Sequence, residues 1–446
     1  MEHPDWPPTL AYLLQWTQSR APDRSAMQQR FTALLALQAQ PLPAIIKITG
    51  TNGKGSVCAM LEASLLAAGK SVAMFTSPHL TRVTERLRIN GVEISTTAME
   101  QHAQALRNQL EPWVAQHGLT YLPSFFEILI LIALRACQHA GVEVAIFEAG
   151  IGGSNDAVSL LPGQLAAITS VGIDHADILG HTLAAIALDK SGIASDNTPL
   201  LLSPSLTPDL LAVIRTRAAQ HGNQLIQCQR ESIQVLQHTL AGIEFTYSES
   251  PDSMRSFNGC LNLPGQHQVD NLALVLKLLS LLQQQNLIAD FKQACQGLHQ
   301  VNWPCRLNPI AHNPRWLLDV AHNAHGMHAL IASLAVLLPF EQRILLWGSA
   351  QDKDYPAYLE RLPQLAGKIY LVEGFNRAAS SATLAAVLPK TARLCGSFAS
   401  VDSACASLNA QFKDSGNTII VAGSVFLAGA VLQQLQPAWA TKPALP

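Results

Sequence analysis

The chain has 446 residues, of which 48% are hydrophobic and only 13% are charged, and its formal net charge is −2. This length and apolar content predict two or three domains with large buried cores. Because the chain has no basic stripe that could neutralise a phosphate backbone, we do not expect nucleic acid as a partner.

The cysteines and the lack of membrane signals indicate an intracellular protein. Eight cysteines are scattered along the chain without a C-x-x-C pair, which favours free, mostly buried thiols in a reducing compartment. Residues 1–4 lack the basic and then apolar pattern of a secretory leader. The most apolar helical stretch, 125–136, is too short to span a bilayer and contains Arg135. We therefore expect a cytoplasmic protein with no membrane partner.

Strands and helices alternate in the first half of the chain. Residues 1–43 are expected to form surface helices, which end at Pro41 and Pro43. Helices are expected over 97–116 and 125–140, and strands over 45–48, 71–77, 142–149, 165–171, 199–202 and 225–228. This alternation predicts an α/β fold with a parallel sheet and helices on both of its faces.

The pattern changes after residue 230 and again after residue 300. Between 231 and 263 apolar residues alternate, as in an antiparallel hairpin or small β-subdomain, and helices over 268–284 and 289–298 complete a first domain, 1–300. A second, smaller α/β domain is expected over 301–436, with strands at 316–321, 343–348, 368–373 and 418–422. The tail, 437–446, is expected to be flexible. Ligands of such folds collect at the carboxyl ends of the strands, which predicts a site between the domains.

The stretch from Ala44 to Cys58 is the strongest chemical signal in the chain. A β-branched run ends at Gly50, and apolar residues return at helical spacing from Val57. A strand, a glycine-rich turn and a helix form a phosphate cradle, because backbone N–H groups and the helix N-terminus face the anion and Lys54 supplies a positive charge. The glycine spacing departs from the strict P-loop pattern, and an ordinary glycine-rich turn is the alternative.

Polar groups follow the neighbouring strands, where parallel strands bring their carboxyl ends together. Ser77, Glu148 and His175 each lie at or just after a predicted strand end. A hydroxyl, a carboxylate and an imidazole beside a phosphate loop would suit Mg²⁺. Taken singly, each of the three is as well explained by a turn cap, an ion pair or a structural histidine. Lys190 would by default be a solvated helix residue, since its ammonium would repel a metal ion unless it were carbamylated.

The second domain has its own polar groups at strand ends. Asp319 and His322 follow the strand at 316–321, and Arg306 near the domain boundary could hold a phosphate or carboxylate with two hydrogen bonds. Each of these could equally belong to turn structure.

The set of motifs resembles folylpolyglutamate synthase/dihydrofolate synthase, within the Mur-ligase superfamily. The resemblance covers roughly residues 45–430 and is carried by motifs along this whole span. The motifs that match are the segments 50–56, 76–80, 85–91, 125–127, 148–153, 174–175, 190–193, 264–268 with Asn271, 303–306, 319–323, 352–354 and 423–424.

The resemblance implies an ATP-dependent amide ligase with an N-terminal P-loop domain and a C-terminal Rossmann-like domain. The acid substrate, dihydropteroate or a folate, would form an acyl phosphate that L-glutamate then attacks. The family pattern implies ATP binding by Gly50, Thr51, Asn52, Gly53, Lys54, Gly55, Ser56, Asn271, Arg306 and Asp319. It implies catalytic roles for Lys54, Lys190 and His322, with His322 near the glutamate.

The metal and substrate residues follow from the same resemblance. It implies magnesium ligation by Ser77, Glu148 and His175, with Lys190 carbamylated to help hold a second magnesium. The pteroate side would be formed by Ser124, Phe125, Phe126, Glu127 and Asp156. We expect a monomer that binds only small-molecule substrates.

One loop departs from the family pattern. Where the family has Arg-Leu-Asp-Ala-Thr-Asn, residues 154–159 are Ser-Asn-Asp-Ala-Val-Ser, so only Asp156 and Ala157 match. A paralogous ligase acting on another carboxylic acid is therefore a second hypothesis. A P-loop small-molecule kinase is a third, which the Asp319 and His322 set disfavours, and a catalytically inactive binding protein is a fourth, which Lys54 and Glu148 disfavour.

Overall fold

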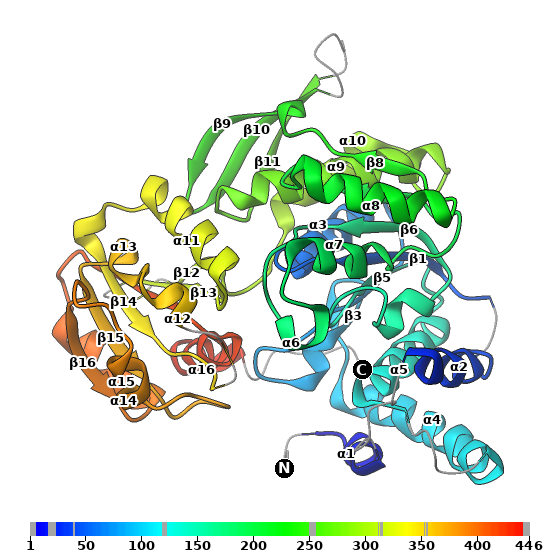
Figure 1. The fold of residues 1–446 in the computed structure, drawn as a ribbon, viewed down its shortest axis with the longest axis horizontal. Coiled ribbons are helices and arrows are strands. Elements are labelled where there is room, and N and C mark those ends of the chain that lie inside the picture. The colour runs from blue at the N-terminus through cyan, green and yellow to red at the C-terminus, as the bar shows by residue number, and fades with distance from the viewer. Residues whose placement is uncertain are drawn as a thin grey trace.

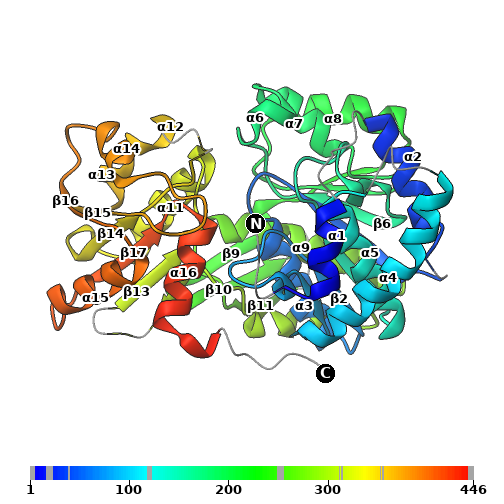
Figure 2. The same ribbon diagram turned by 90° about the horizontal axis from the view of Figure 1, so that it is seen from below.

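The protein is described by a computed structural model, which covers residues 6–16, 24–38, 41–117, 123–248, 256–310, 312, 315–351, 353 and 356–439. Two α/β bodies lie side by side, and a small antiparallel sheet projects from the N-terminal one (Figure 1). The view from below shows that α16 of the C-terminal body lies on the side facing the N-terminal body (Figure 2). The chain passes from one large sheet to the other through residues 301–305. The domain limits at residues 300 and 436 stay a prediction.

The N-terminal body is built on an eight-stranded sheet whose order is β4-β3-β2-β5-β1-β6-β7-β8. Its parallel strands are β1 (Ala44–Thr49), β2 (Val72–Phe75), β5 (Val144–Glu148), β6 (Gly163–Ile168), β7 (Leu200–Leu202) and β8 (Leu225–Gln227). Two short antiparallel strands, β3 (Leu87–Ile89) and β4 (Val92–Glu93), extend one edge. The central strands are buried and mostly apolar because helices cover both of their faces, although β1 also contains Lys47 and β5 ends at Glu148.

Helices pack on both faces of this sheet, as the alternating pattern predicts. One face is covered by α3 (Lys54–Ala67), α9 (His267–Gln284) and α10 (Phe291–Gln296). The other face carries α1 (Pro8–Trp16), α2 (Arg24–Leu35), α4 (Thr96–His117), α5 (Phe125–His139), α7 (Leu183–Ser191) and α8 (Pro208–Gln220). The short α6 (Ala176–Leu179) lies just before α7. The predicted strands and helices of this body are confirmed to within a few residues.

The small sheet confirms the predicted antiparallel subdomain. It consists of β9 (Ile233–Thr239), β10 (Gly242–Ser248) and β11 (Ser256–Leu261), in the order β11-β10-β9. Ile243, Phe245 and Leu261 are fully buried and belong to the same core as α3 and α9. Leu240, in the turn between β9 and β10, packs against the core of the C-terminal body. The subdomain therefore contacts both bodies.

The C-terminal body has a six-stranded sheet in the order β12-β13-β17-β14-β15-β16. The strands are β12 (Arg306–Ile310), β13 (Arg315–Asp319), β14 (Arg343–Trp347), β15 (Lys368–Val372), β16 (Leu394–Phe398) and β17 (Thr418–Ala422), parallel except for the β12–β13 pair. The helices are α11 (Ala324–Leu337), α12 (Pro356–Leu359), α13 (Leu362–Leu365) and α14 (Ser381–Ala386) on one face, with α15 (Val401–Gln411) and α16 (Val425–Leu435) on the other. Six 3₁₀ turns complete the described elements, at Val83–Arg86, Ala157–Leu160, Arg230–Ser232, Gly297–Gln300, Phe340–Gln342 and Pro437–Trp439.

Two sequence predictions are wrong in part. The N-terminal helices α1 and α2 are not merely on the surface, because Leu10, Leu13 and Phe31 are fully buried in the sheet's core. The predicted tail begins with an ordered turn: the carbonyl of Trp439 accepts a hydrogen bond from Arg82 Nη1 at 2.8 Å. Residues 440–446 lie outside the described residues.

The thiols and the membrane prediction can also be compared with the structure. The eight cysteines are free; six are buried, and Cys260 and Cys395 are exposed. None of the helices in the described ranges is long and apolar enough to cross a bilayer.

Candidate active site

The glycine loop after β1 requires glycine at two positions for different neighbours. Gly53 has φ +87°, and a Cβ there would lie 2.7 Å from Asn271 Oδ1. A Cβ on Gly55 would lie 2.9 Å from the indole ring of Trp303. Both distances are shorter than real Cβ contacts, so only glycine lets α9 and the interdomain segment come so close to the loop.

The loop is hydrogen-bonded to the segment that follows β6 and to its own lysine, Lys54. Thr51 N donates to Ser170 O at 2.9 Å, and Thr169 Oγ1 donates to Asn52 O at 2.6 Å. Lys54 Nζ donates to Gly50 O at 2.9 Å and to Thr51 O at 3.3 Å. The ammonium group thus lies over the loop at the N-terminus of α3, as a phosphate cradle requires.

Glu148, at the end of β5, is a buried carboxylate beside this lysine. Its side chain is 4% exposed, and burial raises its pKa, while Lys54, the backbone N–H of Ser77, Arg306 and Arg86 all oppose that rise. Glu148 Oε2 accepts the hydrogen bond from Ser77 N at 3.1 Å. The strand ends of β2 and β5 therefore bring Ser77 and Glu148 together, as predicted.

His175 and Lys190 also lie near Lys54, and burial lowers the pKa of each. Burial, above all, lowers the pKa of His175 to about 4. Lys190 is 2% exposed, and burial and then the charge of Lys54 lower its pKa to about 7. Within the described residues the Lys190 amine makes no hydrogen bond or ion pair. A neutral imidazole can ligate a metal, and a neutral amine can react with CO₂.

The donor set fits a hard cation in part. Oxygen ligands are available from Glu148 and the Ser77 hydroxyl, next to the phosphate loop, which suits Mg²⁺. No group of three His, Cys, Asp or Glu side chains is placed to hold a metal ion in the described part of the chain. A complete magnesium shell would therefore need oxygens from phosphate, from water or from a carbamate on Lys190.

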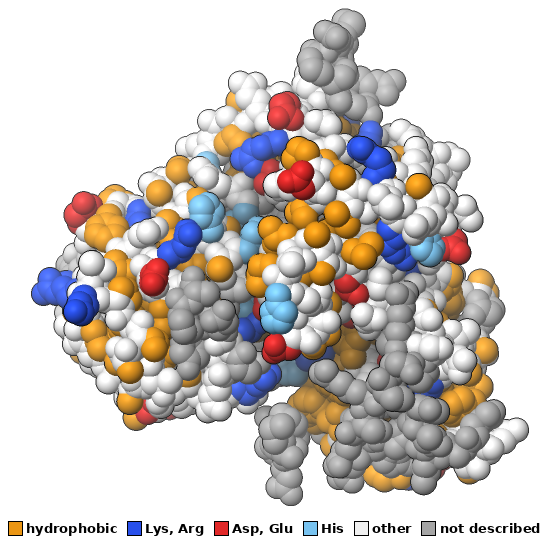
Figure 3. Space-filling view, viewed as in Figure 1, with side chains coloured by type: hydrophobic (Ala, Val, Ile, Leu, Met, Phe, Trp, Pro, Cys, Tyr) orange, Lys and Arg blue, Asp and Glu red, His pale blue; other side chains and the backbone are white. Residues whose placement is uncertain are grey.

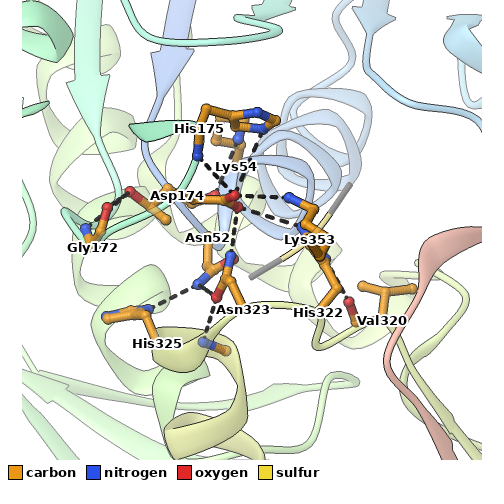
Figure 4. A network of polar contacts seen from close by, with 12 residues as sticks. Asn52, Lys54, Gly172, Asp174, His175, Val320, His322, Asn323, His325 and Lys353 are labelled. Atoms are coloured by element: carbon orange, nitrogen blue, oxygen red, sulfur yellow. Dashed lines mark hydrogen bonds and ion pairs between the residues drawn. The ribbon is translucent and has the colours of Figure 1, made fainter. Parts of the chain in front are cut away.

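Asp174 connects the two bodies and faces three donors of the C-terminal one (Figure 4). Its carboxylate pairs with Lys353 Nζ at 2.8 Å, accepts from Asn323 Nδ2 at 2.7 Å and lies 3.5 Å from His322 Nε2. Although burial acts in the opposite direction, His322 and Lys353 hold the pKa of Asp174 well below its usual range. His322 Nδ1 lies 2.8 Å from the Val320 carbonyl, which can only accept, so Nδ1 donates there.

A second bridge joins the phosphate loop to the start of α11 (Figure 4). Asn52 Nδ2 donates to Asn323 Oδ1 at 3.0 Å and to His325 Nδ1 at 2.9 Å, while Asn323 Nδ2 lies 3.2 Å from Asn52 Oδ1. Because both Nδ2 hydrogens donate, His325 Nδ1 accepts and the ring is neutral. In the space-filling view, histidine side chains gather where the two bodies meet (Figure 3).

Of the predicted nucleotide residues outside the loop, Asn271 lies close to it and Arg306 lies close to Glu148. Asn271 Nδ2 donates to Gln268 Oε1 at 2.8 Å, and the Gln268 amide reaches Ser56 Oγ at 3.4 Å. Arg306 lies within range to lower the pKa values of Glu148 and Asp319. Asp319 itself accepts from Leu307 N at 3.1 Å and Ala321 N at 2.8 Å, so it also shapes the strand ends.

A cavity of about 220 Å³ lies between the bodies beside these groups. Its lining includes Ser77, Glu148, Trp303, Arg306, Val425 and Trp439. Apart from this cavity, four apolar side chains in and just before α6 and α7 are exposed: Ile173, Ile178, Leu183 and Leu188 are between 42% and 48% exposed.

The predicted substrate residues divide into two kinds. Ser124 and Glu127 form a capping box at the start of α5, and Glu127 also pairs with buried Arg30, whose Nη2 lies 2.7 and 2.6 Å from the two carboxylate oxygens. Their polar groups are therefore used within the fold. Phe125 and Phe126 carry no such bonds, and Phe125 stacks on Trp6 with ring centroids 5.1 Å apart.

Asp156 also acts within its own loop. Its Oδ2 accepts from Gly150 N at 2.8 Å and Ile151 N at 3.0 Å, and its Oδ1 accepts from Val158 N at 2.9 Å. Burial raises its pKa to about 6 in spite of these bonds. Asp156 thus fixes the turn after β5.

Both halves of the chain match known protein families. The Mur ligase middle domain matches residues 48–279, and the Mur ligase glutamate ligase domain matches residues 305–425. The folylpolyglutamate synthase of Lacticaseibacillus casei is 32% identical over 395 residues, which is 87% of this chain and 89% of that protein. The chain belongs to the folylpolyglutamate synthase/dihydrofolate synthase family of Mur ligases. It is therefore an enzyme of the ligase class, as the sequence predicts.

Two further likenesses extend over both bodies of this family member. The dihydrofolate synthase/folylpolyglutamate synthase of Bacillus subtilis is 31% identical over 337 residues, which is 74% of this chain and 77% of that protein. A solved structure of Escherichia coli FolC in complex with DHPP and ADP has a TM-score of 0.78 and 27% identity, covering 96% of this chain and 97% of that one. The predicted fold class and family are confirmed.

Sequence reasoning missed two residues of this Mur-ligase site. Asp174 belongs to the matching segment 174–175, but its partners Asn323 and Lys353 lie 149 and 179 residues further on. No local pattern could reveal that contact. Arg30 was also missed, although the Ser124-Phe-Phe-Glu127 spacing is the signature of a capping box and could have shown that Glu127 is structural.

Proposed function

We propose that this chain is an ATP-dependent ligase that joins L-glutamate to dihydropteroate, to a folate, or to both, through an acyl phosphate. The observation that carries the proposal is the position of Lys54. It lies over the phosphate loop with Glu148, His175 and Lys190 around it. The bridges of Asn52 and Asp174 to Asn323 place the C-terminal body against this same loop.

In this proposal ATP binds at residues 50–56, with its γ-phosphate at Lys54. Asn271, Arg306 and Asp319 would hold the rest of the nucleotide. Support comes from their placement: the Asn271 amide lies against Gly53, and Arg306 lies in the cavity between the bodies. Lys54 would neutralise charge on the phosphoryl group as it is transferred.

Ser77, Glu148 and His175 would hold Mg²⁺, and Lys190 would help hold a second ion as its carbamate. The neutral Lys190 amine would take up CO₂ and release one proton to give that anion. Bound magnesium would supply charge neutralisation at the phosphate oxygens. The low pKa of Lys190, caused by its burial, supports this modification because an ammonium cannot react with CO₂.

The proposed reaction has two displacements. A carboxylate oxygen of the acid bonds to the γ-phosphorus, the bond from that phosphorus to the β,γ-bridging oxygen breaks, and ADP leaves with the electron pair. The glutamate amine then attacks the acyl carbon, phosphate leaves from the tetrahedral intermediate, and the nitrogen loses a proton. His322 would lie near the glutamate, and contact between the two bodies would keep water from the acyl phosphate.

Three accompanying expectations complete the proposal. The enzyme would act as a monomer in the cytoplasm. Residues 1–300 would form the P-loop domain and residues 301–436 the Rossmann-like domain. Phe125 and Phe126 would face the pteroate, whereas Ser124, Glu127 and Asp156 would act by fixing the surrounding loops.

Release of ADP should be measured with dihydropteroate, a tetrahydrofolate and a panel of other carboxylic acids, each with and without L-glutamate. We expect ADP release with one or both pterins that depends on glutamate. Glutamate-dependent release with a non-pterin acid alone would replace the folate assignment by that of a paralogous ligase. A stable phosphorylated product without any need for an amine would instead identify a kinase.

The altered 154–159 loop keeps the paralogue as a second candidate, but its structure weakens that reading. Val158 is fully buried and Ser159 is 8% exposed, so these two departures from the family pattern point into the core. Ser154 packs against Gly192, where an added Cβ would meet Ser154 Cβ at 2.7 Å. Returning Ser154 to Arg and comparing the acid preference of the two proteins would test whether this position selects the acid.

A further inference from the structure

Arg86 lies beside the proposed phosphate-transfer site and is not among the residues proposed to bind ATP, magnesium or substrate. It ends the 3₁₀ turn Val83–Arg86, and its carbonyl accepts from Thr76 N at 2.9 Å. The backbone of Arg86 is therefore tied to the turn that carries Ser77. Burial lowers the pKa of Arg86, and the nearby charges of Glu148 and Glu85 oppose that change.

Two neighbours fix the plane of the Arg86 guanidinium. Its Nε donates to His79 Nδ1 at 3.0 Å, and its Cζ lies 5.4 Å from the centroid of the Phe125 ring. Trp6 supports both neighbours, because it stacks on Phe125 and meets the His79 ring edge-on at 6.2 Å. The fork of the guanidinium is thus held in one orientation before any ligand binds.

The outer nitrogens of that fork are unused. Arg30, Arg82 and Arg88 in the same body each pair with a glutamate, at 2.6 to 3.0 Å. Arg86 forms no ion pair with any residue that the structure describes, and its Nη1 and Nη2 make no hydrogen bond there. The positive charge of Arg86 is therefore not neutralised by direct contact with a carboxylate in the described part of the chain. A partly buried guanidinium whose outer nitrogens lack a protein partner there favours an anion with two acceptor oxygens.

The position of Arg86 indicates which anion this is. On one side lie Glu148 and Ser77, beside the expected γ-phosphate, and on the other lies Phe125, on the expected pteroate side. We propose that Arg86 binds the carboxylate of the acid substrate through Nη1 and Nη2 and holds it in line for attack on the γ-phosphate. This inference rests on the proposed function. His79 acts as a positioning residue that turns the fork toward the carboxylate.

The test uses the full-length enzyme with Arg86→Met and Arg86→Lys. Steady-state kinetics are measured with whichever acid of the panel the wild type accepts best. Arg86→Met should raise KM for that acid by about 10- to 100-fold, because a charged bidentate contact is lost. KM for ATP and for L-glutamate should stay within about twofold of the wild type. Arg86→Lys should recover part of the loss, since a point charge replaces the fork.

Arg107→Met is the matched control. Arg107 also lies over an aromatic ring, Tyr12 at 4.1 Å, but pairs with Glu111 on the surface far along α4. Its removal should leave all three KM values unchanged. The urea midpoint of each variant shows whether a kinetic change reflects unfolding.

The outcomes separate this inference from the proposed function. A wild type that uses a non-pterin acid overturns the folate assignment, while a selective rise in KM for that acid in Arg86→Met still supports the inference. An unchanged KM for the acid in a folded Arg86→Met variant overturns the inference alone. Equal losses toward acid, ATP and glutamate also overturn it, since they indicate a structural role. A wild type that releases no ADP with any acid overturns both.

Discussion

Two buried lysines in the N-terminal body differ in what surrounds them. Lys47 in β1 is fully buried and Lys190 at the end of α7 is 2% exposed, and burial lowers the pKa of each to about 7. Lys47 Nζ donates to Ser159 O at 3.0 Å, Leu161 O at 3.0 Å and Ser195 Oγ at 2.7 Å. Lys190 makes no such bond in the described part of the chain.

The comparison shows that a shifted pKa alone does not identify a catalytic group. Burial is the first cause of the lowered pKa in both lysines, but Lys47 donates three hydrogen bonds, two to the segment after the Asp156 loop and one to Ser195. Lys190 is left as a free amine among the charges of Lys54, Asp189, Asp174 and Asp156. Unused bonding capacity next to charged groups, rather than burial, is what distinguishes Lys190, the proposed carbamate site, from Lys47.

The largest effect is expected for Lys190→Met. We predict that kcat/KM for ADP release falls about 10³-fold, because the group that would carry the carbamate is lost. The urea midpoint should change little, since the amine has no partner to lose. In the wild type, removal of CO₂ should lower the rate and bicarbonate should restore it, and Lys190→Met should respond to neither. A folded Lys190→Met variant with a rate within tenfold of the wild type would contradict the proposed role of Lys190.

Asp174→Asn comes next, and it changes the charges near Lys190 without touching Lys47. Asparagine keeps the shape but loses the charge that pairs with Lys353 and His322. We expect kcat/KM to fall about 100-fold, because contact between the bodies is no longer held by charged bonds. Asp196→Asn is the control, as Asp196 pairs with His221 on the surface of the same body. Equal rates for the two variants would argue against a role for the Asp174 bridge.

Lys47→Met should act on stability rather than on chemistry. Three acceptors lose their donor, while removal of a buried charge offsets part of that cost, so we expect a loss of about 2 kcal/mol in the free energy of unfolding. The rate per folded molecule should stay within about threefold of the wild type, because Lys47 does not reach the site. Lys70→Met removes an exposed pair with Glu143 and should change stability by less than about 1 kcal/mol. Loss of activity in a folded Lys47→Met variant would contradict the prediction that Lys47 acts only on stability.

The smallest expected effect is the change in the free energy of unfolding for each pH unit. The pKa of Lys47 is about 7 in the folded protein and near its ordinary value of 10.5 in the unfolded chain. The unfolded chain therefore binds more protons between pH 7 and pH 10, and stability rises with pH there. Relative to Lys47→Met, the wild type should gain up to about 1.4 kcal/mol per pH unit in this range. Urea titrations at pH 7, 8 and 9 test this, and a flat or falling difference would contradict it.

The sequence was sufficient for those parts of the site that depend on strand ends. Apolar runs identify β1, β5 and β6, and the ends of parallel strands meet, so Lys54, Glu148 and His175 could be placed together. Strands without a long apolar run could not be predicted in this way. β3 has only three residues, and β16 has no buried residue in Leu394–Phe398. β12 contains Pro309 and Leu307 at φ +51°, neither of which is typical of a strand.

Contacts between the bodies could not be predicted, because they depend on how two separately recognisable units are oriented. In the sequence Asp174 has no feature that distinguishes it from other turn residues. Its partners Lys353 and Asn323 belong to the C-terminal body. Glu127 was assigned to substrate from the family motif, but buried Arg30 takes up its carboxylate. Such pairings depend on tertiary packing and cannot be predicted from neighbouring residues, whereas the glycine loop can be recognised from its consecutive residues alone.

Transfer of oxygen from the acid to phosphate tests the central claim most directly. The acid substrate is prepared with ¹⁸O in both carboxylate oxygens, and the phosphate released in the presence of ATP and L-glutamate is analysed by mass spectrometry. An acyl phosphate that is displaced by the amine predicts one ¹⁸O in each phosphate and one in the amide product. Phosphate without ¹⁸O, released together with the amide product, would contradict the acyl-phosphate account.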